Sequence, residues 1–168
     1  MNNDEFKLYS KELKKKYKND KKKKELQEIE KQNNLKMILK ILTKTIKDCH
    51  TYDYDVVKSP YLPLIIYDFR YEYTYCIMIV DLDAVDIQNN GRYILLHYLT
   101  INNSENLVTY IPPRPPKNSG IHRYVVSIFR QRYALNIESP EREDFKINLF
   151  IKNNDLCLLD NFIFMTSR

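Results

Sequence analysis

From residue 51 onward, short apolar segments alternate with polar segments, and this alternation restricts the fold more than any other feature of the chain. The apolar segments are rich in β-branched and aromatic residues, which are typical of strands. They cover residues 62–69, 71–81, 93–102, 122–131 and 145–153. No helix-length repeat alternates with them, so a parallel sheet of β-α-β units is not expected. We predict a mainly β protein with antiparallel sheets packed face to face.

The segments between the predicted strands carry turn signals, and the chain has only two glycines. Gly91 follows two asparagines, a combination that favours a turn. Gly120 stands just before the segment 122–131, where glycine accepts the positive φ that a sharp corner can require. We therefore expect a loop at residues 112–120, leading directly into a strand.

Residues 34–47 fit two patterns. Leu35, Ile38, Leu39, Leu42 and Ile46 lie on one face of a helix, whereas Leu35, Met37, Leu39 and Ile41 lie on one side of a strand. The residues alone do not decide between these two structures.

The positive charge is concentrated at the N-terminal end of the chain. Residues 1–48 carry a net charge of +7 and the remaining residues −2, within a total of +5. We predict a basic extension at residues 1–33, helical or disordered, and one compact domain at residues 34–168. The extension is either a solvated charged surface or a polycation that binds phosphates of RNA or of an anionic membrane surface. The candidate RNA-binding lysines are Lys14, Lys15, Lys16, Lys18, Lys21, Lys22, Lys23 and Lys24.

Composition and motifs argue against several classes of protein. There is no apolar run of membrane-spanning length and no secretory or transit signal, so we expect a cytoplasmic monomer. The three cysteines have no CxxC spacing, so we predict no metal and no cofactor. GxSxG, HExxH, P-loop and dinucleotide motifs are all missing from the sequence, so we do not expect an enzyme.

A few polar residues lie at strand ends or in apolar surroundings. Asp81 and Asp83 close one predicted strand, and His97 lies within another. His122 and Tyr124 are two residues apart, so on a strand they share a face, while Arg123 points to the other face. Their N–H and O–H groups suit an oxyanion such as phosphate, and an aspartate could orient a histidine. Taken singly, however, each histidine is more often a hydrogen-bonded core residue than a ligand.

The stretch with sequence PPRPP, residues 112–116, admits two interpretations. It could be an exposed polyproline ligand for another protein, or the wall of a pocket in this one. Only four residues separate it from an apolar strand, which favours the pocket wall.

Three motifs resemble the phosphatidylethanolamine-binding protein (PEBP) family, which includes the Raf kinase inhibitor proteins. They are VDLDAV at residues 80–85, LLHYLTIN at residues 95–102 and RPPKNSGIHRYVVSIFRQ at residues 114–131. The resemblance implies a Greek-key β-sandwich with a small anion pocket, and it favours a strand at residues 34–47. The ligand-binding residues that it implies are Asp81, His97, Arg114, Pro115, Pro116, His122 and Tyr124, with Asp83, Gly120 and Arg123 as structural support.

The chain departs from the family pattern at several positions of these motifs, and Leu95 and Leu96 stand where an aromatic residue is expected. Leu82 and Val85 replace the prolines of the family's Asp-Pro-Asp-Ala-Pro, and Arg114 replaces a glycine beside the bound anion. The arginine either fills the pocket or adds a cation to it.

The resemblance implies a non-enzymatic protein that binds a phosphate-type anion or a phospholipid headgroup and acts through protein partners, such as a kinase, in signalling or regulation. The alternative is a structural component of the large ribosomal subunit in mitochondria, which would use the basic extension on RNA.

Overall fold

The computed structural model describes residues 37–41, 44–86 and 91–168. The chain divides into two units, Met1–Lys36 and Met37–Arg168. The predicted basic extension and its candidate RNA-binding lysines lie outside the described residues, and so does the predicted boundary after residue 33. All described residues belong to the second unit.

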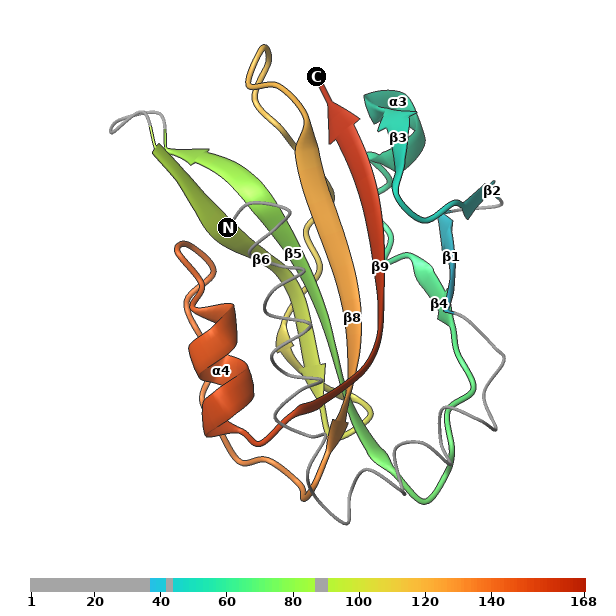
Figure 1. Ribbon diagram of the computed structural model, residues 1–168, viewed down its shortest axis with the longest axis vertical. Coiled ribbons are helices and arrows are strands. Elements are labelled where there is room, and N and C mark those ends of the chain that lie inside the picture. The colour runs from blue at the N-terminus through green and yellow to red at the C-terminus, as the bar shows by residue number, and fades with distance from the viewer. Residues whose placement is uncertain (1–36, 42–43, 87–90) are drawn as a thin grey trace, which may run out of the picture. The chain divides into compact units, whose positions relative to one another are not determined.

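Two β-sheets form this unit (Figure 1). The larger sheet has six strands in the order β3 (His50–Asp53), β9 (Cys157–Ser167), β8 (His122–Gln131), β5 (Thr74–Asp86), β6 (Gly91–Ile101) and β7 (Glu105–Val108). The smaller sheet has three strands in the order β2 (Lys44–Ile46), β1 (Ile38–Ile41) and β4 (Leu64–Ile66). The predicted mainly β fold is confirmed.

The two sheets enclose a common hydrophobic core. Leu39, Ile41 and Ile46 of the smaller sheet belong to the same buried cluster as Ile79 of β5 and Val126 of β8. Successive side chains of a strand point to opposite faces, so alternate residues of β5 and β8 supply this core. The segment that fits both helix and strand patterns is therefore strand in its described part, because its alternate apolar residues close the sandwich.

The prediction of a strand at residues 145–153 is wrong. These residues contain the helix α4 (Ile147–Asn153), which buries Ile147 and Ile151, one helical turn apart, and leaves Leu149 54% exposed. A strand would have placed all three side chains on one face. The segment is short and rich in apolar residues, and such segments do not distinguish a strand from a buried helix.

Two further differences concern the edges of the larger sheet. β3 pairs with β9 in parallel, whereas the other strand pairs are antiparallel. Residues 103–108, which we expected to form a turn segment, contain the short edge strand β7. Both edge strands are only four residues long and expose polar side chains, which weakens a strand signal in the sequence.

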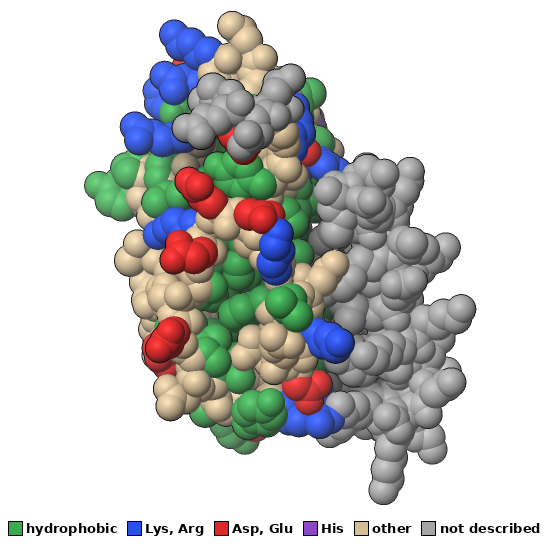
Figure 2. All heavy atoms as spheres, turned by 90° about the vertical axis from the view of Figure 1, so that its left-hand side faces the viewer, with side chains coloured by type: hydrophobic (Ala, Val, Ile, Leu, Met, Phe, Trp, Pro, Cys, Tyr) green, Lys and Arg blue, Asp and Glu red, His purple; other side chains and the backbone are tan. Residues whose placement is uncertain are grey.

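The described surface carries mixed charges. On the face shown in Figure 2, acidic and basic side chains are interspersed with hydrophobic ones. A second short helix, α3 (Tyr54–Val57), follows β3. In the part of the chain that the structure describes, no helix has the length and apolar character needed to cross a membrane.

Candidate functional site

A pocket of about 290 Å³ lies where β5, β6 and β8 meet the loop that joins β7 to β8. All seven predicted ligand-binding residues line it. The full lining consists of Asp81, Ala84, Val85, Tyr93, Leu95, His97, Ile111, Pro112, Arg114, Pro115, Pro116, His122 and Tyr124. The proline-rich stretch is thus a wall of the pocket. Tyr93, Leu95 and Ile111 were not among the predicted residues.

Two β-bulges turn side chains toward the pocket. β5 has one extra residue between the pairs Asp81↔Leu95 and Ala84↔Tyr93, next to Asp81. β6 has one extra residue, His97, between the pairs Ile79↔Tyr98 and Val80↔Leu96. A bulge bends its strand and redirects the side chains beside it. Asp81 and His97 therefore lie at local irregularities of β5 and β6.

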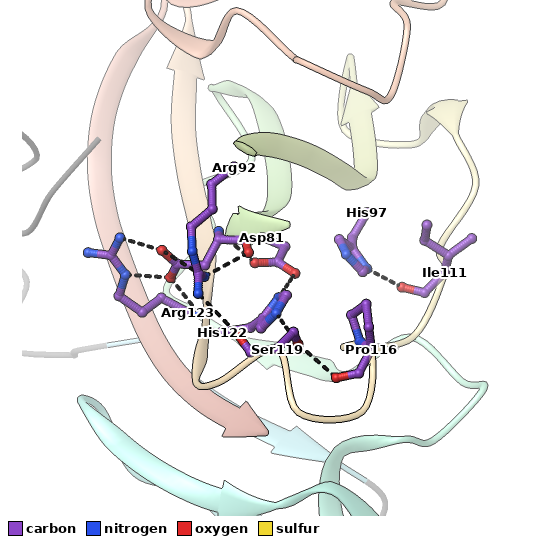
Figure 3. A network of polar contacts seen from close by, with 9 residues as sticks. Asp81, Arg92, His97, Ile111, Pro116, Ser119, His122 and Arg123 are labelled. Atoms are coloured by element: carbon purple, nitrogen blue, oxygen red, sulfur yellow. Dashed lines mark hydrogen bonds and ion pairs between the residues drawn. The ribbon is translucent and has the colours of Figure 1, made fainter. Parts of the chain in front are cut away.

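Asp81 and His122 form a buried pair at the pocket (Figure 3). Oδ2 of Asp81 lies 2.8 Å from Nδ1 of His122, and the two residues are 3% and 1% exposed. The backbone N–H of Asp83 donates to Oδ1 of Asp81 over 2.8 Å. Both carboxylate oxygens of Asp81 thus have a hydrogen-bond partner, which offsets part of the cost of burying the pair.

Ser119 determines which nitrogen of His122 carries a proton. Its Oγ lies 2.8 Å from His122 Nε2 and 2.7 Å from the carbonyl oxygen of Pro116. The carbonyl can only accept, so the serine proton points to Pro116, and Oγ accepts from Nε2–H of His122. Asp81 and His122 share one further proton between Oδ2 and Nδ1. In either placement of that proton, the pair is neutral overall.

The hydrogen bonds that link Asp81, His122 and Ser119 connect the same residue types as a hydrolase triad. The hydrogen bond between the histidine and the serine, however, has the opposite direction. A nucleophilic serine donates its proton to histidine, whereas Ser119 donates to Pro116 and accepts from His122. The contact holds the imidazole in place and does not activate the hydroxyl.

His97 is held by the loop that follows β7. Its Nδ1 lies 2.8 Å from the carbonyl oxygen of Ile111, which can only accept, so Nδ1 carries a proton. Burial lowers the pKa of His97, and the nearby Arg142 and His122 lower it further, against the opposing effects of Ile111 and Asp81. Nε2 of His97 is buried and has no hydrogen-bond partner among the described residues.

Tyr124 supplies the second unpartnered buried atom. Its ring stacks on Phe164 with centroids 5.3 Å apart, and it meets the edge of His97 at 5.2 Å. Its Oη is buried and makes no hydrogen bond of normal geometry among the described residues, although the Asp81 side chain and the Arg114 backbone lie near enough to affect its pKa. Burial raises the pKa of the Tyr124 phenol, and the nearby carboxylate of Asp81 raises it further, so the phenol keeps its proton.

Asp83 and two arginines brace the pocket from outside. Arg123 binds the Asp83 carboxylate through Nε at 2.6 Å and Nη2 at 2.8 Å. Burial opposes ionisation of Asp83, but the bonds to Arg123 outweigh it and lower the pKa of that carboxyl. Arg92, which was not predicted, donates to the backbone carbonyls of Asp83 and Ser119 and so links β5 to the loop (Figure 3).

The loop itself is shaped by residues that accept unusual backbone angles. The Ser119 N–H donates to the Pro116 carbonyl over 3.2 Å, as in a β-turn, with Asn118 at a φ of 62°. Gly120 has a φ of 88°, as expected for the corner before β8. Arg92, Ile111 and Arg142 were not predicted, because their contacts join residues that are distant in the sequence. Ser119 was not predicted either. Only the position of Ser119 in a turn, three residues before His122, could have suggested its contact.

These features define a class: a β-sandwich protein with a small pocket at its larger sheet, lined by buried acidic, imidazole and phenol side chains among apolar ones. The sequence profile described as "Phosphatidylethanolamine-binding protein" matches residues 42–156. The chain therefore belongs to the phosphatidylethanolamine-binding protein family.

Solved structures with the same fold include a carboxypeptidase Y inhibitor, determined in complex with its cognate proteinase. It is 16% identical, the match covers 78% of this chain and 82% of that one, and the TM-score is 0.64. A phosphatidylethanolamine-binding protein from Plasmodium vivax is 15% identical, with 85% and 97% of the two chains covered and a TM-score of 0.56. One from Plasmodium falciparum is 12% identical, with 80% and 88% covered and a TM-score of 0.52.

Proposed function

We propose that this protein is a non-enzymatic binding protein whose pocket takes a phosphate-type anion, either free or as the headgroup of a larger molecule. The observation that carries the proposal is the presence of two buried polar atoms, Nε2 of His97 and Oη of Tyr124, without partners in the same pocket. A buried polar atom without a hydrogen bond costs about 1–3 kcal/mol. A ligand that bonds both atoms removes this cost.

The charges around the pocket support an anion. The Asp81–His122 pair is neutral overall, so its carboxylate does not by itself repel a negative ligand. Arg114 lines the pocket and is exposed, so its guanidinium can approach a ligand at the pocket mouth. The arginine replaces a glycine of the family pattern, and the pocket remains open beside it. Of the two roles expected for this residue, we therefore propose that of an added cation.

Protein partners in signalling or regulation are the second part of the proposal. The structural relative that inhibits carboxypeptidase Y was solved with its proteinase, which supports protein binding by this fold in general. We propose that this chain also acts by binding another protein, and the anion pocket supplies a site through which a ligand could regulate that contact.

The alternative of a ribosomal scaffold rests on the lysine-rich segment of the sequence. That segment lies outside the described residues, and the relatives named above are described as a proteinase inhibitor and as phosphatidylethanolamine-binding proteins. We therefore favour the binding protein.

The proposal is tested by titrating inorganic phosphate into the ¹⁵N- and ¹³C-labelled protein and following the side-chain NMR signals of His97 and Tyr124. We expect both to shift at millimolar phosphate. Tyr124→Phe should weaken the binding, and Tyr98→Phe, a change on β6 outside the pocket lining, should leave it unchanged. Phosphate that moves neither signal at millimolar concentration would remove the basis of the proposal.

A further inference from the structure

The pocket places a definite requirement on the protons of its ligand, beginning with His97. Because Nδ1 of His97 donates to the Ile111 carbonyl, a neutral ring has only a lone pair at Nε2. A neutral His97 can therefore accept a hydrogen bond at this position but cannot donate one. An oxyanion without a proton would bring oxygen lone pairs against the nitrogen lone pair.

The surroundings of His97 favour the neutral ring. The charged and titratable groups that affect it are Asp81 of β5, His122 of β8 and Arg142 of the segment before α4, while Tyr124 of β8 contacts its ring. Arg142 donates to the backbone carbonyls of Leu96 and His97, which brings a permanent positive charge to this strand. The negative charge of Asp81 is balanced by the proton that it shares with His122. His97 is only 2% exposed, so a charge on its ring would also be desolvated.

The balance of charge points to a ligand with a single negative charge. Arg114 is the one lysine or arginine among the residues that line the pocket. The Asp81–His122 pair adds no net charge, and Tyr124 retains its proton as a hydrogen-bond donor. One cation and one phenolic donor match a monoanion better than a dianion.

We propose, on the basis of the binding function above, that the pocket selects a phosphate monoanion that carries an O–H group: dihydrogen phosphate or a phosphate monoester in its monoanionic form. The ligand's own O–H donates to Nε2 of His97, a second oxygen accepts from Tyr124 Oη–H, and Arg114 balances the remaining charge. A phosphate diester is also a monoanion, but it has no O–H group. It leaves the lone pair of His97 unpaired and binds more weakly.

This selectivity makes binding dependent on pH through the ligand. A phosphate monoester loses its second proton with a pKa of about 6. Above that pH, the predominant dianion must take up one proton in order to bind. The affinity for the monoester therefore falls about tenfold per pH unit above the ligand's second pKa, whereas the affinity for a diester does not follow this trend.

Isothermal titration calorimetry on the full chain with methyl phosphate and dimethyl phosphate tests the proposal. At pH 7.5, measurements in two buffers with different ionisation enthalpies give the number of protons taken up. We expect close to one proton per methyl phosphate bound and at least tenfold weaker binding of dimethyl phosphate. Inorganic phosphate and sulfate form a second pair of equal size, in which only phosphate carries a proton near neutral pH, and phosphate should bind at least tenfold more tightly.

The ¹⁵N chemical shifts of the His97 ring show where the proton resides in the complex. We expect a neutral ring with Nδ1 protonated in both the free and the bound protein. Equal affinities for monoester and diester, or binding without proton uptake, would overturn the selectivity while leaving the binding function intact. A His97 ring protonated at both nitrogens in the complex would also overturn it, because the protein would then supply the proton. Failure of all four ligands to bind at millimolar concentration would instead refute the binding function itself.

Discussion

His97 and Ile111 are joined by two hydrogen bonds, one in each direction. The backbone N–H of Ile111 donates to the His97 carbonyl over 3.0 Å, and Nδ1–H of His97 donates to the Ile111 carbonyl over 2.8 Å. His97 is the bulged residue of β6, so its backbone carbonyl is available to the loop. One residue thus anchors the proline loop, lines the pocket and leaves its ring Nε2 without a hydrogen-bond partner among the described residues.

The buried His97 makes stability depend on pH. The pKa of His97 is lowered on folding from an unfolded value of 6.5. As the pH falls below 6.5, the folded state therefore binds fewer protons than the unfolded state. The free energy of unfolding therefore decreases below pH 6.5, by at most about 1.4 kcal/mol per pH unit, until the lower folded pKa is reached. Urea unfolding of wild type and His97→Gln between pH 7.5 and pH 5 should show a steeper loss for wild type. Identical slopes would contradict the assignment of a neutral buried ring.

Removing one partner of the Asp81–His122 pair should cost more than removing both. His122→Leu leaves a carboxylate that is 97% buried without its main partner, and we expect a loss of about 3–5 kcal/mol. The double variant Asp81→Leu, His122→Leu leaves no buried charge and should be more stable than His122→Leu alone. Guanidinium unfolding of the four members of this double-mutant cycle measures the difference, and a double variant that loses the sum of the two single losses would refute the coupling.

Arg114 should contribute to anion affinity without contributing to folding. Its side chain is exposed and lines the pocket, so Arg114→Gln should weaken phosphate binding about fivefold, as is typical of a charge worth about 1 kcal/mol at an exposed site. The free energy of unfolding should stay within about 0.5 kcal/mol of wild type.

Lys117→Gln is a matched control for that experiment, because Lys117 lies in the same loop, is exposed and does not line the pocket. Calorimetry at two ionic strengths should show a weaker salt dependence for Arg114→Gln only. An equal effect of both substitutions would show that the loop acts only through its general charge.

The ion pair of Asp83 and Arg123 should stabilise the fold at neutral pH and lose this effect in acid. The pKa of Asp83 is lowered on folding, so the stabilisation is present above the ordinary carboxyl pKa of 3.8 and disappears as the pH falls through the lower folded pKa. We expect Arg123→Gln to lose about 2 kcal/mol at pH 7, the typical value for a hydrogen bond to a charged group. The difference from wild type should shrink below pH 4, as measured by urea unfolding. A constant difference at all pH values would mean that packing, and not charge, is responsible.

The cysteines should differ in reactivity. Cys76 is fully buried in β5, which raises the pKa of its thiol to about 12, whereas Cys49 is exposed. Because the thiolate is the reactive form, iodoacetamide should label Cys49 in the native protein and Cys76 only after unfolding. Mass spectrometry of the labelled peptides identifies the sites, and rapid labelling of native Cys76 would show that β5 opens readily.

The mainly β fold was predictable because the signal for strands is local. The segment 122–131 coincides with β8. Most of its consecutive residues are buried, because both faces of this strand are covered. The segment 145–153 was not predictable in the same way, because Ile147, Leu149 and Ile151 fit either period and only contact with the sheet selects the helix. The spacing of His122 and Tyr124 predicted their shared face, and the resemblance to the family identified Asp81 and His97.

The sequence by itself determined the central strands and the corner at Gly120, because each depends on neighbours within a few positions. It also identified the polar residues that line the pocket, through motifs that resemble those of the family. The positions of the protons were decided by the tertiary structure alone. They follow from Ser119 and Pro116 on one side of His122, and from Ile111 beside His97. These partners are backbone or hydroxyl groups, which carry no distinctive pattern in the sequence, and only the folded chain brings them within hydrogen-bonding distance.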